Sequence, residues 1–353
     1  MCKIISIGTA VPPFILKQDT ADSLLTEHYR DVLTKRGMDV MHRILAHPGI
    51  TKRHVAVNNI NELLLLKNEN MDSRIQRFTS WAVTLSKEAI QKALADAKKS
   101  TSDIKGLIVN TCTGYICPGI STYLIEAFQL PHSIRVYDLV GSGCGGALPN
   151  IEMGKAVLND LNDNNSIVVC VSVEICSATF EMSNDISLIV SNSIFGDGAA
   201  AVVLSQNGPG LQFNSIDTFY DPEYRNDVRY VYKNGRLHNQ LAPKLPEILA
   251  EKVPPLIYTS LKRKNINPSD VNFWAIHAGG DRILSNLQTR LELPESKMNY
   301  AREVLSQYGN MSSASVLFEL KNIFDDSPQK DDWCSFTSFG AGLSAYTCLA
   351  RFV

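Results

Sequence analysis

The chain has 353 residues, of which 44% are hydrophobic and 20% are charged, and its formal net charge is −2. This length predicts about two domain-sized halves with a core that needs no disulfide or metal for stability. A nearly neutral chain offers no bulk attraction for nucleic acid or for an anionic membrane surface. Because no run of about 18 apolar residues occurs, the sequence also predicts no membrane-spanning helix.

The first half alternates short apolar strands with amphipathic helices. We expect strands where β-branched residues gather, and helices where apolar residues recur at helical spacing. The predicted strands are 4–10, 106–112, 134–140, 166–175 and 199–205, and the predicted helices are 71–97, 121–130 and 147–160.

A second half begins after Gly208-Pro209-Gly210, so we divide the chain into residues 1–205 and 206–353. Strand–helix alternation continues there, which predicts an α/β fold with largely parallel sheets. The similar layout of the two halves suggests a duplication. In this half the predicted helices are 253–264, 281–291 and 311–324, and the predicted strands are 271–278, 333–340 and 344–353.

Cys144 lies in the segment DLVGSGCGGAL, between a predicted strand and a predicted helix. The surrounding glycines allow a sharp turn and a close approach to the backbone. A thiol at a helix N-terminus is favoured as a thiolate, and free N–H groups there can stabilise an oxyanion. The alternative is an inert cysteine in a glycine-rich turn.

His277 and Asn310 are the two other candidate catalytic residues. His277 follows an apolar strand and precedes Gly279-Gly280, where α/β sheets place their ligands, although it is also compatible with an ordinary loop histidine. Asn310 precedes a predicted helix, so it is also compatible with a helix cap. Together, a thiol, a base and an amide donor suit decarboxylative Claisen condensation better than hydrolysis, because histidine and asparagine can both hold an enolate oxygen.

The other seven cysteines lack the C-x2-C spacing of zinc ribbons, and several lie in apolar runs. We interpret them as reduced, packed thiols, which fits a reducing cytoplasm. The N-terminal segment MCKIISIGTAVPP has too short an apolar run for a membrane anchor and lacks a cleavage site for a signal peptide.

Five segments resemble, in their order and spacing, the type III polyketide synthases, the chalcone synthase family of the thiolase superfamily. They are GSGCGGAL, SNSIFGDGAAAVVLS, WAIHAGGDRIL, YGNMSSASV and SFGAGLSAY. The resemblance runs from SIGTAVP to the C-terminus and points to a bacterial-type member. It implies a five-layered αβαβα fold of two similar halves, a homodimer, an acyl-CoA starter, malonyl-CoA as extender, and no bound organic cofactor or metal.

The resemblance also implies roles for individual residues. Cys144 matches the acyl-carrying nucleophile, and His277 and Asn310 match the pair that activates it and stabilises the enolate. Further residues match substrate-binding positions: Phe180 as an aromatic gatekeeper, Lys52 and Arg53 as contacts to CoA phosphates, Cys112 in the cavity wall, Cys117 at the subunit boundary, and Gly279, Gly280, Phe339 and Gly340 in the loops around the pocket.

The chain departs from the family pattern at three places. The family's His-Pro-Gly-Gly is His-Ala-Gly-Gly at 277–280, and its Gly-Phe-Gly-Pro-Gly is Ser-Phe-Gly-Ala-Gly at 338–342. A second gatekeeper phenylalanine falls near His238 or Asn239, which argues against a plant flavonoid substrate. With small Cys112 in the wall, we expect an apolar tunnel past Cys112 that holds a medium or long fatty acyl chain, giving an alkylpyrone or alkylresorcinol.

Three alternatives stay open. One is an enzyme similar to ketoacyl-carrier-protein synthase III, whose histidine motif is usually His-Gln-Ala-Asn rather than His-Ala-Gly-Gly. A second is an enzyme similar to hydroxymethylglutaryl-CoA synthase, which would need an additional glutamate base. A third is a non-catalytic partner subunit on the same fold, which the intact Cys-His-Asn set argues against.

Overall fold

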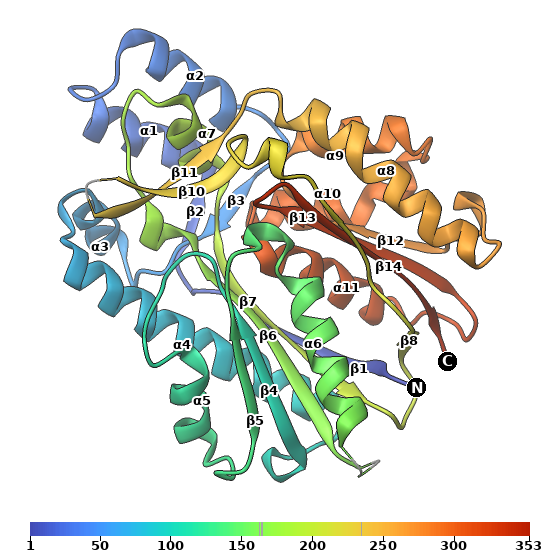
Figure 1. Cartoon of the computed structure of the whole chain (residues 1–353). Coiled ribbons are helices and arrows are strands. Elements are labelled where there is room, and N and C mark those ends of the chain that lie inside the picture. Colours follow the sequence, from blue (N-terminus) through green and yellow to red (C-terminus); the bar gives the residue numbers. More distant parts are fainter. Residues whose placement is uncertain (162, 164, 234) are drawn as a thin grey trace.

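A computed structural model describes the chain except for residues 162, 164 and 234. Its helices and strands run the length of the chain (Figure 1). The helices are α1 (Gln18–Tyr29), α2 (Lys35–Leu45), α3 (Ile60–Leu65), α4 (Met71–Asp96), α5 (Ile120–Phe128), α6 (Ala147–Asp160), α7 (Ile186–Ile194), α8 (Leu245–Arg263), α9 (Asp281–Arg290), α10 (Asn299–Tyr308) and α11 (Ser315–Asp325).

The main sheet has the strand order β12-β13-β14-β8-β1-β7-β6-β4-β5, with β9 added beside β14. Two small two-stranded sheets, β2–β3 and β10–β11, lie apart from it. The strands are β1 (Lys3–Ala10), β2 (Ile15–Lys17), β3 (Lys52–His54), β4 (Ile104–Asn110), β5 (Arg135–Leu139), β6 (Ile167–Ile175), β7 (Asp197–Ser205), β8 (Leu211–Phe213), β9 (Asp217–Tyr220), β10 (Val228–Lys233), β11 (Arg236–Leu241), β12 (Phe273–Ile276), β13 (Trp333–Gly340) and β14 (Ser344–Phe352).

The prediction of largely parallel sheets is wrong. Strand β4 runs parallel to β5 and β6, and β12 runs parallel to β13, but β7 is antiparallel to both β1 and β6, and β13 is antiparallel to β14. Apolar periodicity shows that a strand is buried and does not show its direction. The short link between β13 and β14 also makes a hairpin, which forces antiparallel pairing.

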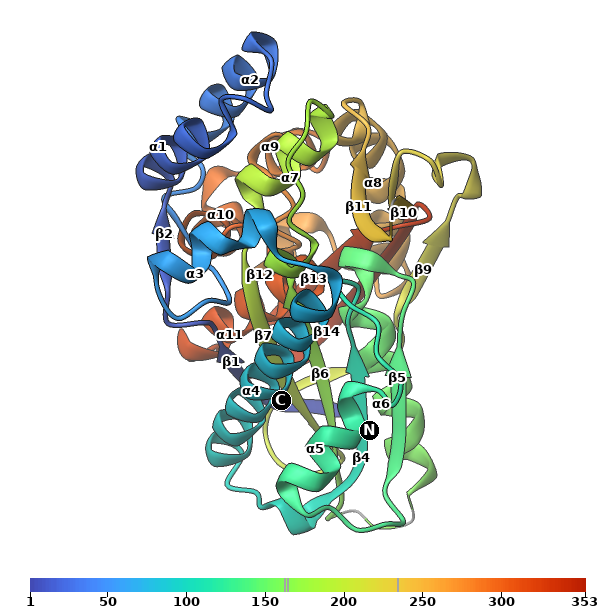
Figure 2. The ribbon, with the colours of Figure 1, turned by 90° about the vertical axis from the view of Figure 1, so that its left-hand side faces the viewer.

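The layers follow from which side of each strand faces which helix. In β6, Val169, Val171 and Val173 pack in the core under α4 and α5, whereas Val168 and Cys170 face the opposite core, which contains α6 and α11. Helices α6 and α11 lie between the β4–β7 region and the β12–β14 region, and α8 and α9 cover the far side (Figures 1 and 2). This is the expected αβαβα layering.

Most predicted elements are confirmed, with shifted ends. The predicted helix 71–97 is α4, and the predicted helix 253–264 begins earlier, at Leu245, with Pro254 and Pro255 inside α8. The predicted strand 271–278 is shorter, because β12 ends at Ile276 and leaves His277 just beyond it. None of the described helices is long and apolar enough to cross a membrane.

The sequence reasoning missed α1, α2, α3, α7, α10, β8, β9 and both small two-stranded sheets. Of these, α1, α2, α7 and the two small sheets lie together at the upper left of Figure 1, with α3 below them. Their own apolar cluster includes Leu16, Leu45, Met182 and Ile189. The division into residues 1–205 and 206–353 stays a prediction. Strand β8 pairs with β1 of the first half and with β14 of the second, so one sheet runs across the proposed boundary.

Candidate active site

Cys144 lies on a tight turn between β5 and α6. Gly141 and Gly143 have φ angles of +99° and +55°, which only glycine adopts without strain, and residues 143–145 form one 3₁₀ turn before α6 begins at Ala147. The turn is pressed against Gly340 at the end of β13. A Cβ atom on Gly340 would lie 2.3 Å from the carbonyl oxygen of Ser142. The second half of the chain therefore helps to shape the turn that carries the thiol.

One pocket brings Cys144, His277 and Asn310 together. Its empty space is about 590 Å³, with the open mouth included. The three residues come from a turn after β5, from the end of β12, and from the segment before α11. Besides them, the walls are mostly apolar, and they include Phe195, Leu241, Leu245, Leu249, Ile283, Phe339 and Leu343. We call this the catalytic pocket.

His277 is buried, with 1% of its surface exposed, and its ring lies edge-on to Phe339 at 5.2 Å between centroids. Its backbone N–H donates to the carbonyl oxygen of Thr337, as the next rung after the β12–β13 ladder. Burial lowers the pKa of His277 to about 3, so the imidazole is neutral at ordinary pH. A neutral imidazole can accept the proton of a thiol.

Asn310 is held by two hydrogen bonds. Its Oδ1 accepts from the backbone N–H of Ser312 at 2.8 Å, and its Nδ2 donates to the carbonyl oxygen of Gly279 at 3.1 Å. The first bond belongs to the local turn before α11, where the helix itself is capped at Ala314 and not at Asn310, so the catalytic role of Asn310 stays a prediction. Because an amide nitrogen carries two hydrogens, Nδ2 keeps one donor for a ligand.

Burial raises the pKa of the Cys144 thiol to about 12, which outweighs the help expected from the helix N-terminus. A hydrogen bond from Ser312 Oγ to Cys144 Sγ, at 3.3 Å, acts in the opposite direction. Ser312 adopts a left-handed φ of 50° although it is not glycine. Such strain is typical of functional positions, and here it accompanies a hydroxyl directed at the nucleophile.

A buried carboxyl lies behind Cys112. Glu174, on β6, is fully buried and accepts from the backbone N–H of Cys112 at 3.0 Å, from Thr113 Oγ1 at 2.9 Å and from Ser313 Oγ. Burial raises the pKa of Glu174. The sequence analysis missed Glu174 and Ser312. Glu174 falls in a continuous apolar run, where a charged residue is costly unless it is satisfied, and that contrast was the available signal.

The tunnel expected past Cys112 is not formed, because a polar cluster fills that direction. Cys112 Sγ lies 3.2 Å from Ser312 Oγ and 3.5 Å from Glu174 Oε2. Cys112 is linked to Cys144 through Ser312, but it lines neither of the two pockets, so its place in a cavity wall stays a prediction. An alkyl chain passing it would have to break the hydrogen bonds to Glu174, which is unfavourable.

Phe195 lines the pocket that contains Cys144, and Phe180 does not. Phe195 lines the catalytic pocket and also a second pocket, whereas Phe180 lines only the second one and packs against Tyr29. The gatekeeper role expected for Phe180 therefore stays a prediction, and Phe195 is a second phenylalanine at this place. Both phenylalanines follow buried strands or helices, so position along the chain did not separate them, although SNSIFGDG was among the resembling segments.

The second pocket lies between α1 and α3, and we call it the α1–α3 pocket. Its empty space is about 750 Å³, again with the open mouth included. Its inner end contains Cys176 and Phe195, and Cys176 is close enough to Cys144 and Cys112 for their charges to affect its pKa. The walls are mainly apolar, from Leu16, Leu24, Leu25, Leu63, Leu64, Leu66 and Phe180.

Arg53 does not present its charge to solvent. Its Nε donates to Gln18, and its Nη1 donates to the carbonyl oxygens of Asn192 and Phe195 at 2.9 and 2.8 Å. Burial lowers the pKa of Arg53 to about 10. The predicted contact to CoA phosphates is therefore wrong for Arg53, which instead holds the backbone of Phe195. Lys52 is half-buried on β3, and its role stays a prediction.

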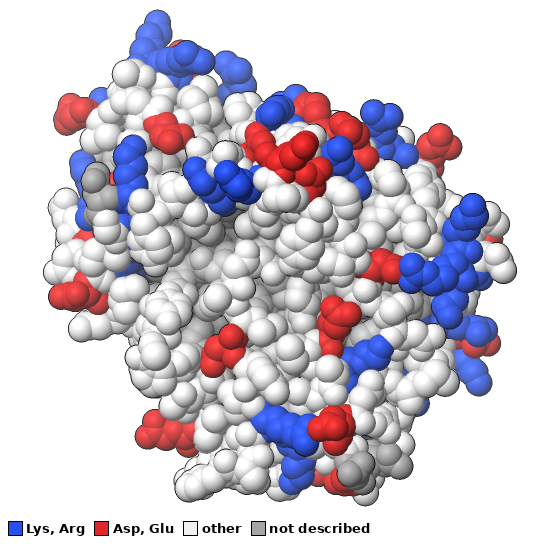
Figure 3. Space-filling model, viewed as in Figure 1, with Lys and Arg blue, Asp and Glu red and all other residues white. Residues whose placement is uncertain are grey.

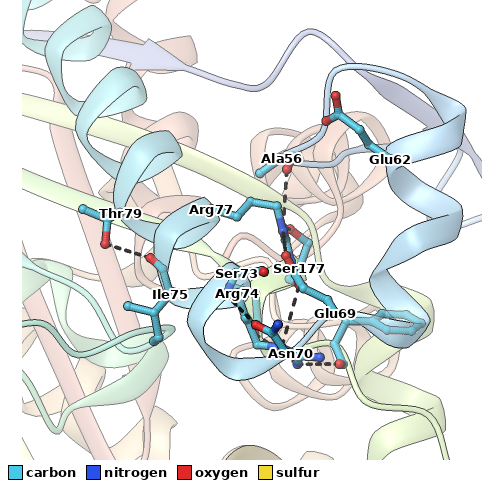
Figure 4. A network of polar contacts seen from close by, with 12 residues as sticks. Ala56, Glu62, Glu69, Asn70, Ser73, Arg74, Ile75, Arg77, Thr79 and Ser177 are labelled. Atoms are coloured by element: carbon cyan, nitrogen blue, oxygen red, sulfur yellow. Dashed lines mark hydrogen bonds and ion pairs between the residues drawn. The ribbon is translucent and has the colours of Figure 1, made fainter.

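A second arginine fixes the 3₁₀ turn Cys176–Thr179 at the inner end of the α1–α3 pocket (Figure 4). Arg77 donates to both carboxylate oxygens of Glu69 at 2.8 Å, to Ser177 Oγ at 2.9 Å and to the Ser177 carbonyl at 3.0 Å. Arg74 donates to the carbonyl of Phe180 at 2.7 Å. Paired, largely buried guanidinium groups of this kind keep a wall rigid.

The remaining predicted site residues divide into two groups. Gly279, Phe339 and Gly340 line the catalytic pocket, and Gly280, with φ +154°, leads into α9. Cys117 is an exposed thiol in the loop before α5 and lines neither pocket, so its place at a subunit boundary stays a prediction. In the described part of the chain, no three His, Cys, Asp or Glu side chains are grouped to hold a metal.

Family models match both parts of the chain. Residues 12–212 match a model described as FAE1/Type III polyketide synthase-like protein. Residues 214–353 match one described as Chalcone and stilbene synthases, C-terminal domain. The first match alone covers more than half of the chain.

Similar curated proteins include the 1,3,6,8-tetrahydroxynaphthalene synthase of Streptomyces griseus, which is 27% identical over 87% of this chain and 82% of its own length. The enzyme of the same name from Streptomyces coelicolor is 27% identical over 86% of this chain and 80% of its own length.

Solved structures show the same fold. The tetrahydroxynaphthalene synthase from Streptomyces coelicolor has a TM-score of 0.88 at 24% identity and covers 99% of both chains. PKS-I from the brown alga Ectocarpus siliculosus has a TM-score of 0.89 at 22% identity, covering 100% of this chain and 98% of its own. With the family matches, these findings show that the chain belongs to the type III polyketide synthases, condensing acyltransferases that use malonyl-CoA and other CoA thioesters.

Proposed function

We propose that Cys144 carries the growing acyl chain, with His277 as its proton acceptor. In the loading step the sulfur of Cys144 attacks the thioester carbonyl of acyl-CoA while the thiol proton passes to His277. The CoA–acyl bond then breaks, and the CoA thiolate takes that proton. Two observations support this step. Cys144 and His277 line one pocket together with Asn310, and the neutral, buried His277 can accept a proton.

In the extension step, Asn310 and His277 hold the thioester oxygen of malonyl-CoA. Loss of CO2 breaks a carbon–carbon bond and leaves an enolate, whose oxygen is stabilised by the spare hydrogen on Asn310 Nδ2 and by the imidazole N–H. The enolate carbon attacks the acyl group on Cys144, which forms the new carbon–carbon bond and releases the cysteine sulfur. The apolar walls of the catalytic pocket keep water from protonating the enolate.

We infer a medium or long fatty acyl starter whose alkyl chain lies in the α1–α3 pocket. The single observation that carries this inference is that Phe195 lines both this apolar pocket and the catalytic pocket. A chain attached to Cys144 and directed past Phe195 would reach the leucines of α1 and α3. Each buried methylene would contribute about 0.8 kcal/mol, so longer starters should be preferred until the pocket is full. The expected product is an alkylpyrone or alkylresorcinol.

A second candidate makes a naphthalene product like the one in the names of the Streptomyces relatives, with malonyl-CoA as both starter and extender. Tyr230 on β10 favours this candidate, because its buried hydroxyl lines the catalytic pocket and its pKa is raised by burial and by nearby Cys112, Cys176, Cys144 and Glu174. A phenol there narrows the space around the nucleophile and offers a hydrogen bond to a polar chain.

The test is incubation with labelled malonyl-CoA, alone and with acyl-CoAs of 2 to about 16 carbons, followed by mass spectrometry of products and of intact enzyme. We expect products and an acyl adduct only with the longer acyl-CoAs, and neither in Cys144→Ala. A naphthalene product from malonyl-CoA alone would favour the second candidate. An adduct that persists in Cys144→Ala would overturn the assignment of the nucleophile.

We propose that the entrance of the catalytic pocket admits the pantetheine arm of CoA. The face shown in Figure 3 is hollowed near its centre, where uncharged residues predominate, while Lys, Arg, Asp and Glu lie toward the rim. Arg229 is a half-buried cation that lines the catalytic pocket. Arg229→Ala should therefore raise the KM for acyl-CoA, and an unchanged KM would contradict this role.

We also propose a homodimer that needs no bound cofactor or metal and works in a reducing cytoplasm, where its eight free cysteines stay reduced. Strand β5 is an outer strand of the main sheet, and exposed Tyr123, Tyr137 and Val140 lie on or next to it. Such an apolar edge suits pairing with a second copy. Sedimentation equilibrium that finds only monomer, or activity lost on dialysis against a chelator, would contradict these proposals.

A further inference from the structure

The backbone N–H of Ala278, next to His277, needs a buried hydrogen-bond acceptor. Strand β12 ends at Ile276, so Ala278 lies beyond the ladder, and it is 0% exposed. A buried N–H without a partner costs on the order of 1–3 kcal/mol. Its acceptor is Glu319 Oε1, at 3.0 Å.

Glu319 lies on α11 among apolar neighbours. Val316, Leu317, Leu320 and Ile323 on the same helix are buried in the central core, and Glu319 itself is 0% exposed. Its second oxygen, Oε2, has no hydrogen-bond partner in the described part of the chain. Burial raises the pKa of Glu319 well above its usual value, which favours the neutral acid. A carboxyl here costs folding energy, which is unexpected unless its contacts with the backbone of Ile276 and Ala278 matter.

The hydrogen bond from Ala278 holds a three-residue turn. The backbone N–H of Gly279 donates to the carbonyl oxygen of His277 at 2.7 Å, which makes Ala278 the centre of a γ-turn. The carbonyl oxygen of Gly279 in turn accepts from Asn310 Nδ2 at 3.1 Å. The turn therefore carries the imidazole and also orients the amide, so moving it would displace two of the three catalytic groups.

We propose that Glu319 is a positioning residue that sets the His277–Gly279 turn through the N–H of Ala278. It does not line the catalytic pocket, so it acts on the reaction only through His277 and Asn310. The proposal rests on the proposed roles of these two residues. It does not depend on which starter the enzyme takes.

The test uses Glu319→Leu, which removes the acceptor, and Glu319→Gln, which keeps an oxygen in its place. We expect Glu319→Leu to lower malonyl-CoA decarboxylation about 10- to 100-fold, because displacements near 1 Å cost this much in catalytic sites. Glu319→Gln should stay within about threefold of the original rate. The matched control is Leu320→Ala, which opens a cavity on the same helix and should lower the melting temperature without changing the rate per folded enzyme.

A rescue experiment separates positioning from stability. A proline at position 278 has no N–H and prefers the φ near −65° that an inverse γ-turn needs. The double variant Ala278→Pro with Glu319→Leu should therefore decarboxylate malonyl-CoA at least tenfold faster than Glu319→Leu alone. If the double variant is as impaired as Glu319→Leu, or if Glu319→Leu lowers only the melting temperature, the proposal is overturned.

A second readout keeps this proposal distinct from the proposed function. The rate of Cys144 alkylation by iodoacetamide depends on His277 as proton acceptor, and it requires no polyketide chemistry. We expect this rate to fall in Glu319→Leu and to recover in the double variant. If the unmodified enzyme does not decarboxylate malonyl-CoA, the proposed function is contradicted. If Glu319→Leu leaves the alkylation rate unchanged, the positioning role of Glu319 is contradicted.

Discussion

The two pockets on either side of Phe195 are built in different ways. The catalytic pocket is formed by turns and strand ends from distant parts of the chain, and its reactive groups are held by specific hydrogen bonds. The α1–α3 pocket is formed largely by leucines of two short helices. Under the proposed function, the reaction depends on exact placement of atoms in the catalytic pocket, whereas the choice of starter depends on the volume and apolar area of the α1–α3 pocket. Changes in the second pocket should alter which substrate reacts, and changes in the first should alter whether any does.

The largest effect is expected from Asn310→Asp. A carboxylate at this position would repel the enolate and lose the donating amide, so malonyl-CoA decarboxylation should fall about 10²- to 10³-fold. Acylation of Cys144 by the starter should change much less, because no enolate forms in that step. The two rates can be measured separately, by release of labelled CO2 and by intact mass. Equal losses in both would mean that Asn310 only supports the local turn.

A smaller effect is expected from filling the α1–α3 pocket. Leu64→Trp should lower kcat/KM for long acyl-CoAs by about tenfold, because the larger side chain takes the space of roughly two buried methylenes. The kcat/KM for short acyl-CoAs should not change. Leu65→Trp is the matched control, because Leu65 is its neighbour on α3 and is 66% exposed. Identical chain-length profiles in the two variants would show that the starter lies elsewhere.

The sequence was informative where a local motif determines the chemistry. Cys144 and His277 were found because glycines cluster beside them, and these glycines are needed for the tight turn of Cys144 and the entry into α9. Asn310 was found by its place in YGNMSSASV. The layered fold followed from the resemblance, although strand directions did not follow from periodicity.

The sequence was uninformative where the site depends on long-range packing. Phe180 and Phe195 look alike along the chain, and only the fold shows which of them lines the pocket that contains Cys144. Arg53 resembles an exposed phosphate contact, yet it is buried against carbonyl groups. The α1–α3 pocket has no motif, since its apolar residues come from α1, α3 and several segments far apart in the sequence.

The contact between Gly340 and the Cys144 turn has a consequence for inheritance and for engineering. Gly340 belongs to the C-terminal half, yet it allows no Cβ beside the backbone of Ser142, Cys144 and Gly145. The halves of this enzyme therefore cannot diverge as independent modules. A chimera can take its N-terminal part from one synthase and its C-terminal part from another. It then has the nucleophile of one parent, while the strand end that packs against the nucleophile's turn comes from the other.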